Sequence, residues 1–257
     1  MINQNCWDLD AVLSIDHQIS PQYFEDAPTG VVENFKILLS RDIFSEGDAQ
    51  SLYDYLMQRQ DDFSASFLDM LQLWLQDELK HYEALRRTYH GISGVSYAEM
   101  DRLFQERIHE IQPIEMVLKD EFTILVTMMF DEIGSVYSYR RDLREYYCHF
   151  GTEIQKIGHH LVKDEGMHFS NAAELLLKHH GDRLDQVEPI LHTISNLEQH
   201  LGKYYKSFFL DHAQEQFRFP PNFNAVIIQV SLARLGLTPY PELIALKQLW
   251  QWVQTGG

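Results

Sequence analysis

The sequence predicts an all-α protein, a four-helix bundle with additional helices before and after it. Apolar residues recur with a period of about 3.6 residues along nearly all of the 257-residue chain. Gly and Pro, which interrupt helices, number only 13 and 8. Two long segments also carry a Glu and a His three residues apart, and each follows a segment with a single Glu on its apolar side. Two helical hairpins would bring these four segments together.

The first bundle helix is predicted within residues 31–60, and two courses are open for it. In one, a short helix over 31–43 is followed by a second helix that begins at a capping box formed by Ser45 and Asp48. In the other, a single continuous helix runs through Glu46. The two courses differ in whether Glu46 lies inside a helix or at its start.

The second bundle helix is expected over about residues 64–89. Its apolar residues form a stripe with helical spacing, and Gly91 and Gly94 are expected to end it. Residues 96–111 have the pattern of a surface helix, which Pro113 would terminate.

Two more long helices complete the predicted bundle, over about residues 114–147 and 152–180. Beyond them, one helix is expected over 185–217. Pro220 and Pro221 break the chain, and two shorter helices are expected within 222–253. No β-strand is predicted.

Length and composition predict one domain over residues 1–257, with a core bundle at about 35–180 and C-terminal helices over 185–253. The formal charge of −17 argues against nucleic acid and anionic membranes as partners. No apolar run reaches the roughly 18 residues of a membrane span. The start of the chain lacks the features of a signal peptide, so a cytoplasmic location is expected. With only two Cys, neither a disulfide framework nor a thiolate zinc cluster is expected.

The most informative pattern is a pair of matching motifs. Asp77-Glu78-x-x-His81 and Asp164-Glu165-x-x-His168 each place a carboxylate and an imidazole on one face of a helix. Glu46 lies 32 residues before Glu78, and Glu132 lies 33 before Glu165. At ~1.5 Å per residue, this spacing returns an antiparallel hairpin to the same depth. A third such pair, Glu106 and His109, lacks an upstream Glu and is expected to be a surface coincidence.

Four Glu and two His in a bundle core predict a carboxylate-bridged site for two metal ions. Hard, anionic oxygen ligands favour iron, with manganese as the alternative, and the absence of thiolates disfavours structural zinc. Exposed charges on amphipathic helices are the competing interpretation, which the apolar residues on the same faces disfavour. Periodicity alone leaves Asp48 as a rival to Glu46. The predicted ligands are Glu46, Glu78, His81, Glu132, Glu165 and His168.

Asp77 and Asp164 each precede a predicted ligand Glu by one residue. A ligand His needs an acceptor for its other ring nitrogen. We expect Asp164 to orient His81 on the opposite helix, and Asp77 to do the same for His168. The alternative for both is a solvated charge.

The pattern resembles the ferritin-like di-iron carboxylate superfamily. Within it, the chain is most similar to the soluble acyl-acyl-carrier-protein desaturases, over about residues 35–180. The matching stretches are Phe35 to Glu46, Glu78-x-x-His81 continuing to Leu85 and Tyr89, Phe130-Asp131-Glu132, and Asp164 to His168. The match of Asp42-x-x-x-Glu46 favours Glu46 over Asp48 as the ligand.

This resemblance implies an enzyme that uses O2, two iron ions and an external electron donor to oxidise an acyl-like or other small organic substrate. It also implies a role in proton delivery for Ser135, which stands where the desaturases have a Thr. Acyl carrier protein and a second copy of the chain are the candidate macromolecular partners. The chain departs from the desaturases in being shorter and strongly acidic. Its one basic cluster on the bundle is Arg140, Arg141 and Arg144, for which a solvated face is the alternative.

Two other functions fit the same ligand set. An iron-handling ferroxidase is the main alternative, and the additional C-terminal helices count against it. A radical-generating reductase subunit would carry a Tyr one turn after the first His of the motif, where this chain has Leu85. The sequence therefore favours the oxidase or oxygenase.

Overall fold

The structure is a computed structural model that describes residues 2–201, 222–241, 248 and 251. All regular elements in these residues are helices, which confirms the all-α prediction. No helix in the described part of the chain is both long enough and apolar enough to cross a membrane.

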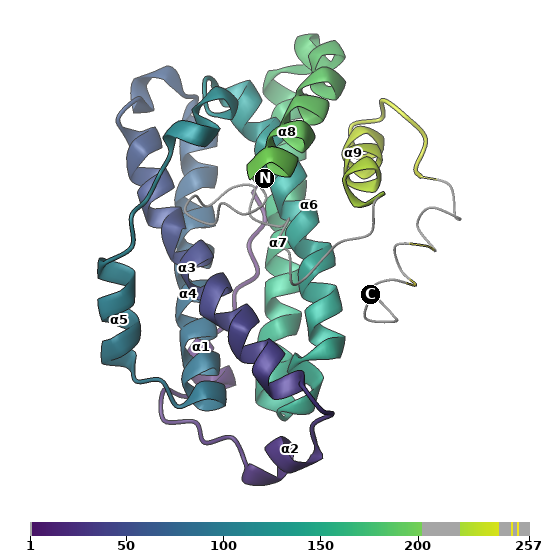
Figure 1. The fold of residues 1–257 in the computed structure, drawn as a ribbon. Coiled ribbons are helices and arrows are strands. Elements are labelled where there is room, and N and C mark those ends of the chain that lie inside the picture. The colour runs from purple at the N-terminus through teal and green to yellow at the C-terminus, as the bar shows by residue number, and fades with distance from the viewer. Residues whose placement is uncertain (1, 202–221, 242–247, 249–250, 252–257) are drawn as a thin grey trace.

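Four long helices form the bundle (Figure 1). They are α3 (Val31–Met57), α4 (Ala65–Ser93), α6 (Glu121–Glu145) and α7 (Thr152–His179). Helix α3 packs along α4, and α6 packs along α7, so the chain forms two helical hairpins. Contacts between α4 and α7 join the hairpins.

Helix α3 is continuous, so the predicted break at a Ser45–Asp48 capping box is wrong and the alternative course is the observed one. Both Glu46 and Asp48 are buried in its middle. Gly47, between them, allows a close contact, because a Cβ at this position would lie 2.6 Å from the ring of Phe104. The glycine therefore lets the chain after α4 pack closely against α3.

The second helix, α4, begins at a side-chain cap, where Ser64 accepts a hydrogen bond from the backbone of Phe67 at 3.2 Å. It runs past Gly91 and ends at Gly94, whose φ of 74° is in the left-handed region. The surface helix, α5 (Tyr97–Gln105), is shorter than the predicted 96–111.

The predicted helix over 114–147 is divided in two. A 3₁₀ helix, η2 (Gln112–Val117), comes first. Helix α6 starts anew because the side chain of Asp120 accepts a hydrogen bond from the backbone of Thr123 at 2.8 Å. The bounds of α7, by contrast, are close to those predicted.

Shorter elements surround the bundle. Helices α8 (Val187–Leu201) and α9 (Phe223–Arg234) pack against each other and against α6. The rest of the predicted helix over 185–217, and most of the chain after α9, lie outside the described residues. The remaining elements are α1 (Leu9–Val12), α2 (Pro21–Asp26), η1 (Gln60–Asp62), η3 (Tyr147–His149) and η4 (Gly181–Gln186).

The buried apolar residues form two clusters at different depths of the bundle. One contains Trp74 of α4 and Ala172 of α7. The other contains Ala84 of α4 and Leu161 of α7. Helices α3, α4 and α7 therefore each pass from one apolar cluster to the other through a short polar stretch, and on α4 and α7 this stretch is the Glu-x-x-His motif.

Candidate metal centre

Each bundle helix supplies part of this polar layer. Helix α3 supplies Glu46, and α6 supplies Glu132. The motifs on α4 and α7 each supply one Glu and one His. All six side chains are buried, with exposed fractions of 0–7%. The structure therefore brings together all six residues that the sequence predicted as metal ligands.

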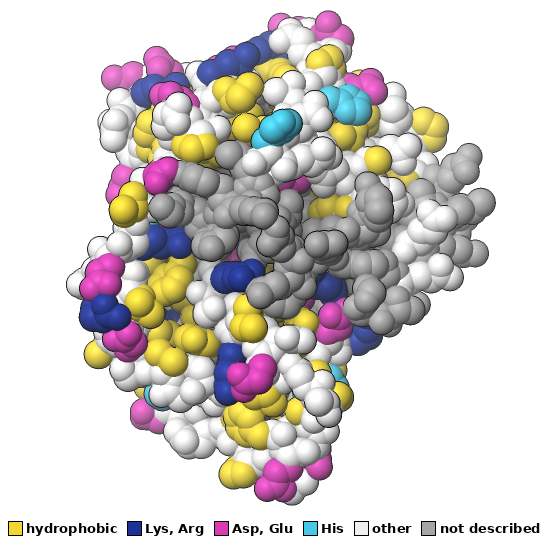
Figure 2. All heavy atoms as spheres, in the orientation of Figure 1, with side chains coloured by type: hydrophobic (Ala, Val, Ile, Leu, Met, Phe, Trp, Pro, Cys, Tyr) yellow, Lys and Arg dark blue, Asp and Glu magenta, His cyan; other side chains and the backbone are white. Residues whose placement is uncertain are grey.

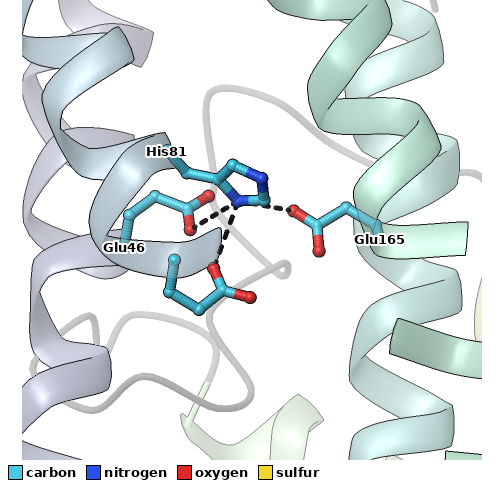
Figure 3. Close-up of side chains that lie close together, drawn as sticks. Glu46, His81 and Glu165 are labelled. Atoms are coloured by element: carbon cyan, nitrogen blue, oxygen red, sulfur yellow. Dashed lines mark ion pairs between the residues drawn. The ribbon is translucent and has the colours of Figure 1, made fainter. Parts of the chain in front are cut away.

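One half of the layer is centred on His81. Its Nδ1 atom lies 3.6 Å from Oε2 of Glu46, 3.3 Å from Oε2 of Glu78 and 3.5 Å from Oε1 of Glu165. Figure 3 shows Glu46 and Glu165 directed at this nitrogen from opposite sides. Three helices thus supply the donors of this half.

The other half is centred on His168 and has the same composition. Its Nδ1 atom lies 3.1 Å from Oε1 of Glu78, 3.3 Å from Oε2 of Glu132 and 3.1 Å from Oε2 of Glu165. Here α6 replaces α3 as the source of the third carboxylate.

Glu78 and Glu165 belong to both halves, and each directs one oxygen to each histidine. Glu46 and Glu132 each belong to one half. Within each half, the potential ligand atoms lie within 4.8 Å of one another. The layer thus offers two adjacent groups of potential metal ligands that have two carboxylates in common.

The donor atoms themselves fit a metal pair. Oε2 of Glu46, both carboxylate oxygens of Glu78 and Nδ1 of His81 are buried and make no hydrogen bond. Buried polar atoms without partners are rare because their desolvation is costly. Metal ions would serve as partners for these atoms, and two divalent cations would neutralise the four carboxylates.

The pKa values show how the site behaves without metal. Burial and the negative charge of Glu46 raise the pKa of Glu78 to about 8. Burial and the charge of Glu78 also raise the pKa of Glu165. Burial opposes the charged form of His81 and His168, but the surrounding carboxylates raise the pKa of both. Bound protons therefore supply positive charge to the metal-free layer.

The remaining ring nitrogens of the two histidines meet the two aspartates. Nε2 of His81 lies 3.1 Å from Oδ2 of Asp164, and Nε2 of His168 lies 3.4 Å from Oδ2 of Asp77. Both aspartates are buried. An N–H donated to such a carboxylate leaves Nδ1 free to bind metal and fixes the ring orientation. Each histidine is thus paired with the aspartate of the opposite motif, as the sequence predicted.

Two aromatic residues outside the predicted ligand set contact the unshared carboxylates. Trp74 donates its indole N–H to Oε1 of Glu132 at 2.9 Å. Tyr139 donates its hydroxyl to Oε1 of Glu46. Their spacing in the sequence indicates that both face the site, because residues four or seven apart lie on the same side of a helix. Trp74 precedes Glu78 by four residues, and Tyr139 follows Glu132 by seven.

The structure separates Asp48 from this site. Asp48 pairs with Arg107 at 2.6 Å and with His109 at 2.8 Å. In the third Glu-x-x-His pair, His109 therefore contacts Asp48, while Glu106 pairs with Arg102 at 2.7 Å. Glu106 and His109 therefore have different partners and do not form a shared pair.

Ser135 and the predicted basic cluster have local partners. Ser135 is half-buried on α6, and its hydroxyl donates to the backbone carbonyl of Asp131 at 3.3 Å. Arg141 is buried and pairs with Asp142 at 2.7 Å, so it does not contribute to an exposed basic face. On the face shown in Figure 2, acidic, basic and apolar side chains of the described residues are interspersed.

No family model matches this chain, and neither a curated protein nor a solved structure is similar to it at a significant level. The likeness to di-iron proteins therefore rests on the chain's own residues. A helical fold with a buried carboxylate–histidine cluster is compatible with a di-iron site.

Proposed function

We propose that the protein is a non-haem di-iron oxidoreductase that uses O2 to oxidise a C–H bond of an acyl-like or other small organic substrate. The observation that carries this proposal is the sharing of Glu78 and Glu165 between two otherwise separate Glu–His halves. A structural site for a single metal ion does not need shared carboxylates. Iron is the proposed metal, with manganese as the alternative.

In this proposal, Glu46 and His81 would hold one ion, and Glu132 and His168 would hold the other. Glu78 and Glu165 would bridge the two. Bound ferrous ions would supply electrons for the reduction of O2. Desaturation would remove two hydrogens from the substrate and consume O2, two further electrons and two protons to yield two waters. Hydroxylation would also consume O2, two electrons and two protons, and it would yield the hydroxylated product and one water. An external electron donor is therefore part of the proposal.

The protein's own residues have distinct proposed roles. Asp77 and Asp164 would hold the histidine rings, while Trp74 and Tyr139 would hold the unshared carboxylates. The apolar clusters on both sides would exclude bulk water from the layer. Proton delivery through Ser135 remains a proposal based on the resemblance to desaturases.

A surface pocket beside α7 has the size of a small-molecule site. It has a volume of about 530 Å³, within the usual range for small-molecule sites. Asn171, which is buried one turn after His168 on α7, is one of its lining residues. The full lining is Ile2, Ser66, Asn171, Glu174, Leu175, Leu177 and Lys178.

The test combines metal loading with product analysis. Anaerobic protein is loaded with ferrous iron, its metal content is measured, and O2 is added with a panel of acyl thioesters, free acids and aldehydes. Mass spectrometry is expected to show a product that has lost two hydrogens or gained one oxygen. Steady oxidation and mineralisation of added iron, with every panel member unchanged, would instead favour iron handling.

A matched pair of variants assigns the reaction to this site. His168→Ala should abolish product formation. His159→Ala removes an exposed histidine from the same helix and should leave product formation unchanged. Equal activity in the two variants would refute the site assignment.

A further inference from the structure

The N-terminal residues lie along α7 as an extended segment (Figure 1). The backbone N–H of Asn3 donates to Oδ1 of Asn171 at 2.9 Å, and Nδ2 of Asn171 donates to the backbone carbonyl of Asn3 at 2.7 Å. Further along, Nζ of Lys163 donates to Oδ1 of Asn5 at 2.6 Å. The segment therefore runs antiparallel to α7 and is held at two points along it.

Between and beyond these two points, the segment contacts both aspartates that face the histidines. Trp7 donates its indole N–H to Oδ2 of Asp164 at 2.8 Å. The side-chain amide of Gln4 donates to Oδ1 of Asp77 at 3.2 Å. A single stretch of chain thus supplies a hydrogen bond to each aspartate.

Trp7 is itself held in place. Its ring stacks on that of His160 with a centroid distance of 4.4 Å and an interplanar angle of 10°. Nζ of Lys80 lies 5.2 Å from the centre of the Trp7 ring and also donates to Oδ1 of Asp77 at 2.9 Å. Helices α4 and α7 therefore both restrain the indole that contacts Asp164.

We infer that residues 3–7 form a strap that positions both histidines through the two aspartates, with Trp7 and Gln4 as its positioning residues. Oδ2 of Asp164 lies within hydrogen-bond distance of both Trp7 and His81. The indole donor therefore restrains rotation of the carboxylate that sets the direction of the His81 ring. Gln4 donates to Oδ1 of Asp77 and so restrains the carboxylate whose other oxygen, Oδ2, faces His168.

This inference rests on the metal-binding part of the proposed function, but its first test needs no metal. The variants are Trp7→Phe, which keeps an aromatic ring on His160, and Gln4→Met, which keeps a side chain of similar length. Each removes one hydrogen-bond donor from one aspartate. Tyr97→Phe is the matched control, because it removes a hydrogen bond to the backbone of Ile15 and touches neither aspartate.

NMR of metal-free protein with ¹⁵N-labelled histidine follows the two Nε2 protons, assigned with His81→Ala and His168→Ala. Trp7→Phe should speed solvent exchange of the His81 proton and leave that of His168 unchanged. Gln4→Met should affect His168 alone, and less strongly because Lys80 still donates to Asp77. Tyr97→Phe should affect neither. Equal changes at both histidines in each variant would indicate general loosening and overturn the inference, as would no change at either.

Titration with Co²⁺ provides the second test. Loss of a group that supports a metal ligand typically weakens binding by about 10-fold or more. Trp7→Phe loosens Asp164 without removing it, so it should weaken one of two Co²⁺ sites by a factor of up to about 10 and spare the other. Wild-type affinity at both sites would overturn the inference. Histidine-specific NMR changes in a protein that binds no Co²⁺ would support the strap and refute the proposed metal function.

Discussion

Trp74 and Glu132 show how the bundle holds an unshared carboxylate in place. The indole N–H of Trp74 on α4 donates a hydrogen bond to Oε1 of Glu132 on α6 at 2.9 Å. The other oxygen, Oε2, then lies 3.3 Å from Nδ1 of His168 on α7. One contact from the neighbouring hairpin thus directs a carboxylate oxygen into the site.

Trp74→Phe should weaken metal binding in the half centred on His168 by about 10-fold. The variant keeps a large apolar side chain but leaves Oε1 of Glu132 buried without its donor. An unsatisfied buried acceptor should also lower the free energy of unfolding by about 1–3 kcal/mol. Stepwise Co²⁺ titration and urea unfolding measure the two effects. Unchanged affinity at both sites would contradict the prediction.

The sharing of carboxylates predicts different metal losses for different variants. Glu165→Ala should reduce binding of both metal ions, because this carboxylate serves both halves. Glu46→Ala should reduce binding of one. Asp48→Ala should leave two ions bound, since Asp48 pairs with Arg107 and His109 instead. Elemental analysis after anaerobic loading and desalting counts the ions. Loss of an ion from the Asp48 variant alone would show that Glu46 is not the ligand.

Metal-free protein should lose stability between about pH 6 and pH 8. Burial and the charge of Glu46 raise the pKa of Glu78 to about 8 in the folded protein, against 4.5 for an unperturbed glutamate. The folded state therefore binds more protons than the unfolded chain in this range, and its stability falls as the pH rises. The raised pKa values of His81 and His168 act in the same direction. Glu46, with a pKa lowered to about 2, does not titrate in this range.

Thermal unfolding in the presence of a chelator, at several pH values, measures this effect. Glu78→Gln cannot ionise at this position and should show a weaker dependence on pH than the wild type. A melting temperature that rises from pH 6 to pH 8 in the wild type would contradict the prediction.

Metal should stabilise the folded protein. At a free metal concentration 100 times the Kd, one independent site adds about 2.7 kcal/mol to the free energy of unfolding. For a chain of this size, each kcal/mol raises the melting temperature by about 2–4 °C. Differential scanning calorimetry with and without Mn²⁺ measures the shift. His81→Ala should reduce the shift, whereas His159→Ala should retain it.

Much of the site was predictable from sequence, because helical periodicity fixes the direction of each side chain and its level along the bundle axis. The motifs at Glu78 and Glu165 lie within long apolar stripes, so their side chains had to face the bundle interior. The intervals of 32 and 33 residues placed Glu46 and Glu132 at the same level. The pairing of each histidine with the opposite aspartate follows from the same geometry.

Tertiary structure alone decided the features that depend on distant residues. The capping-box pattern at Ser45 was a local signal, but α3 continues through it with Glu46, Gly47 and Asp48 buried against other elements. The partner of Asp48 is Arg107, 59 residues away, which no periodicity reveals.

The N-terminal strap has no repeating pattern, so its contacts with both aspartates are visible only in the fold. Helical periodicity predicted five of the six side chains that meet in the bundle core, because a residue's position in a regular helix sets the direction of its side chain. For the sixth, the resemblance to desaturases selected Glu46 over Asp48. Which carboxylates are shared, and which residues hold them, followed from the fold, because those contacts depend on how separate helices and an extended segment pack together.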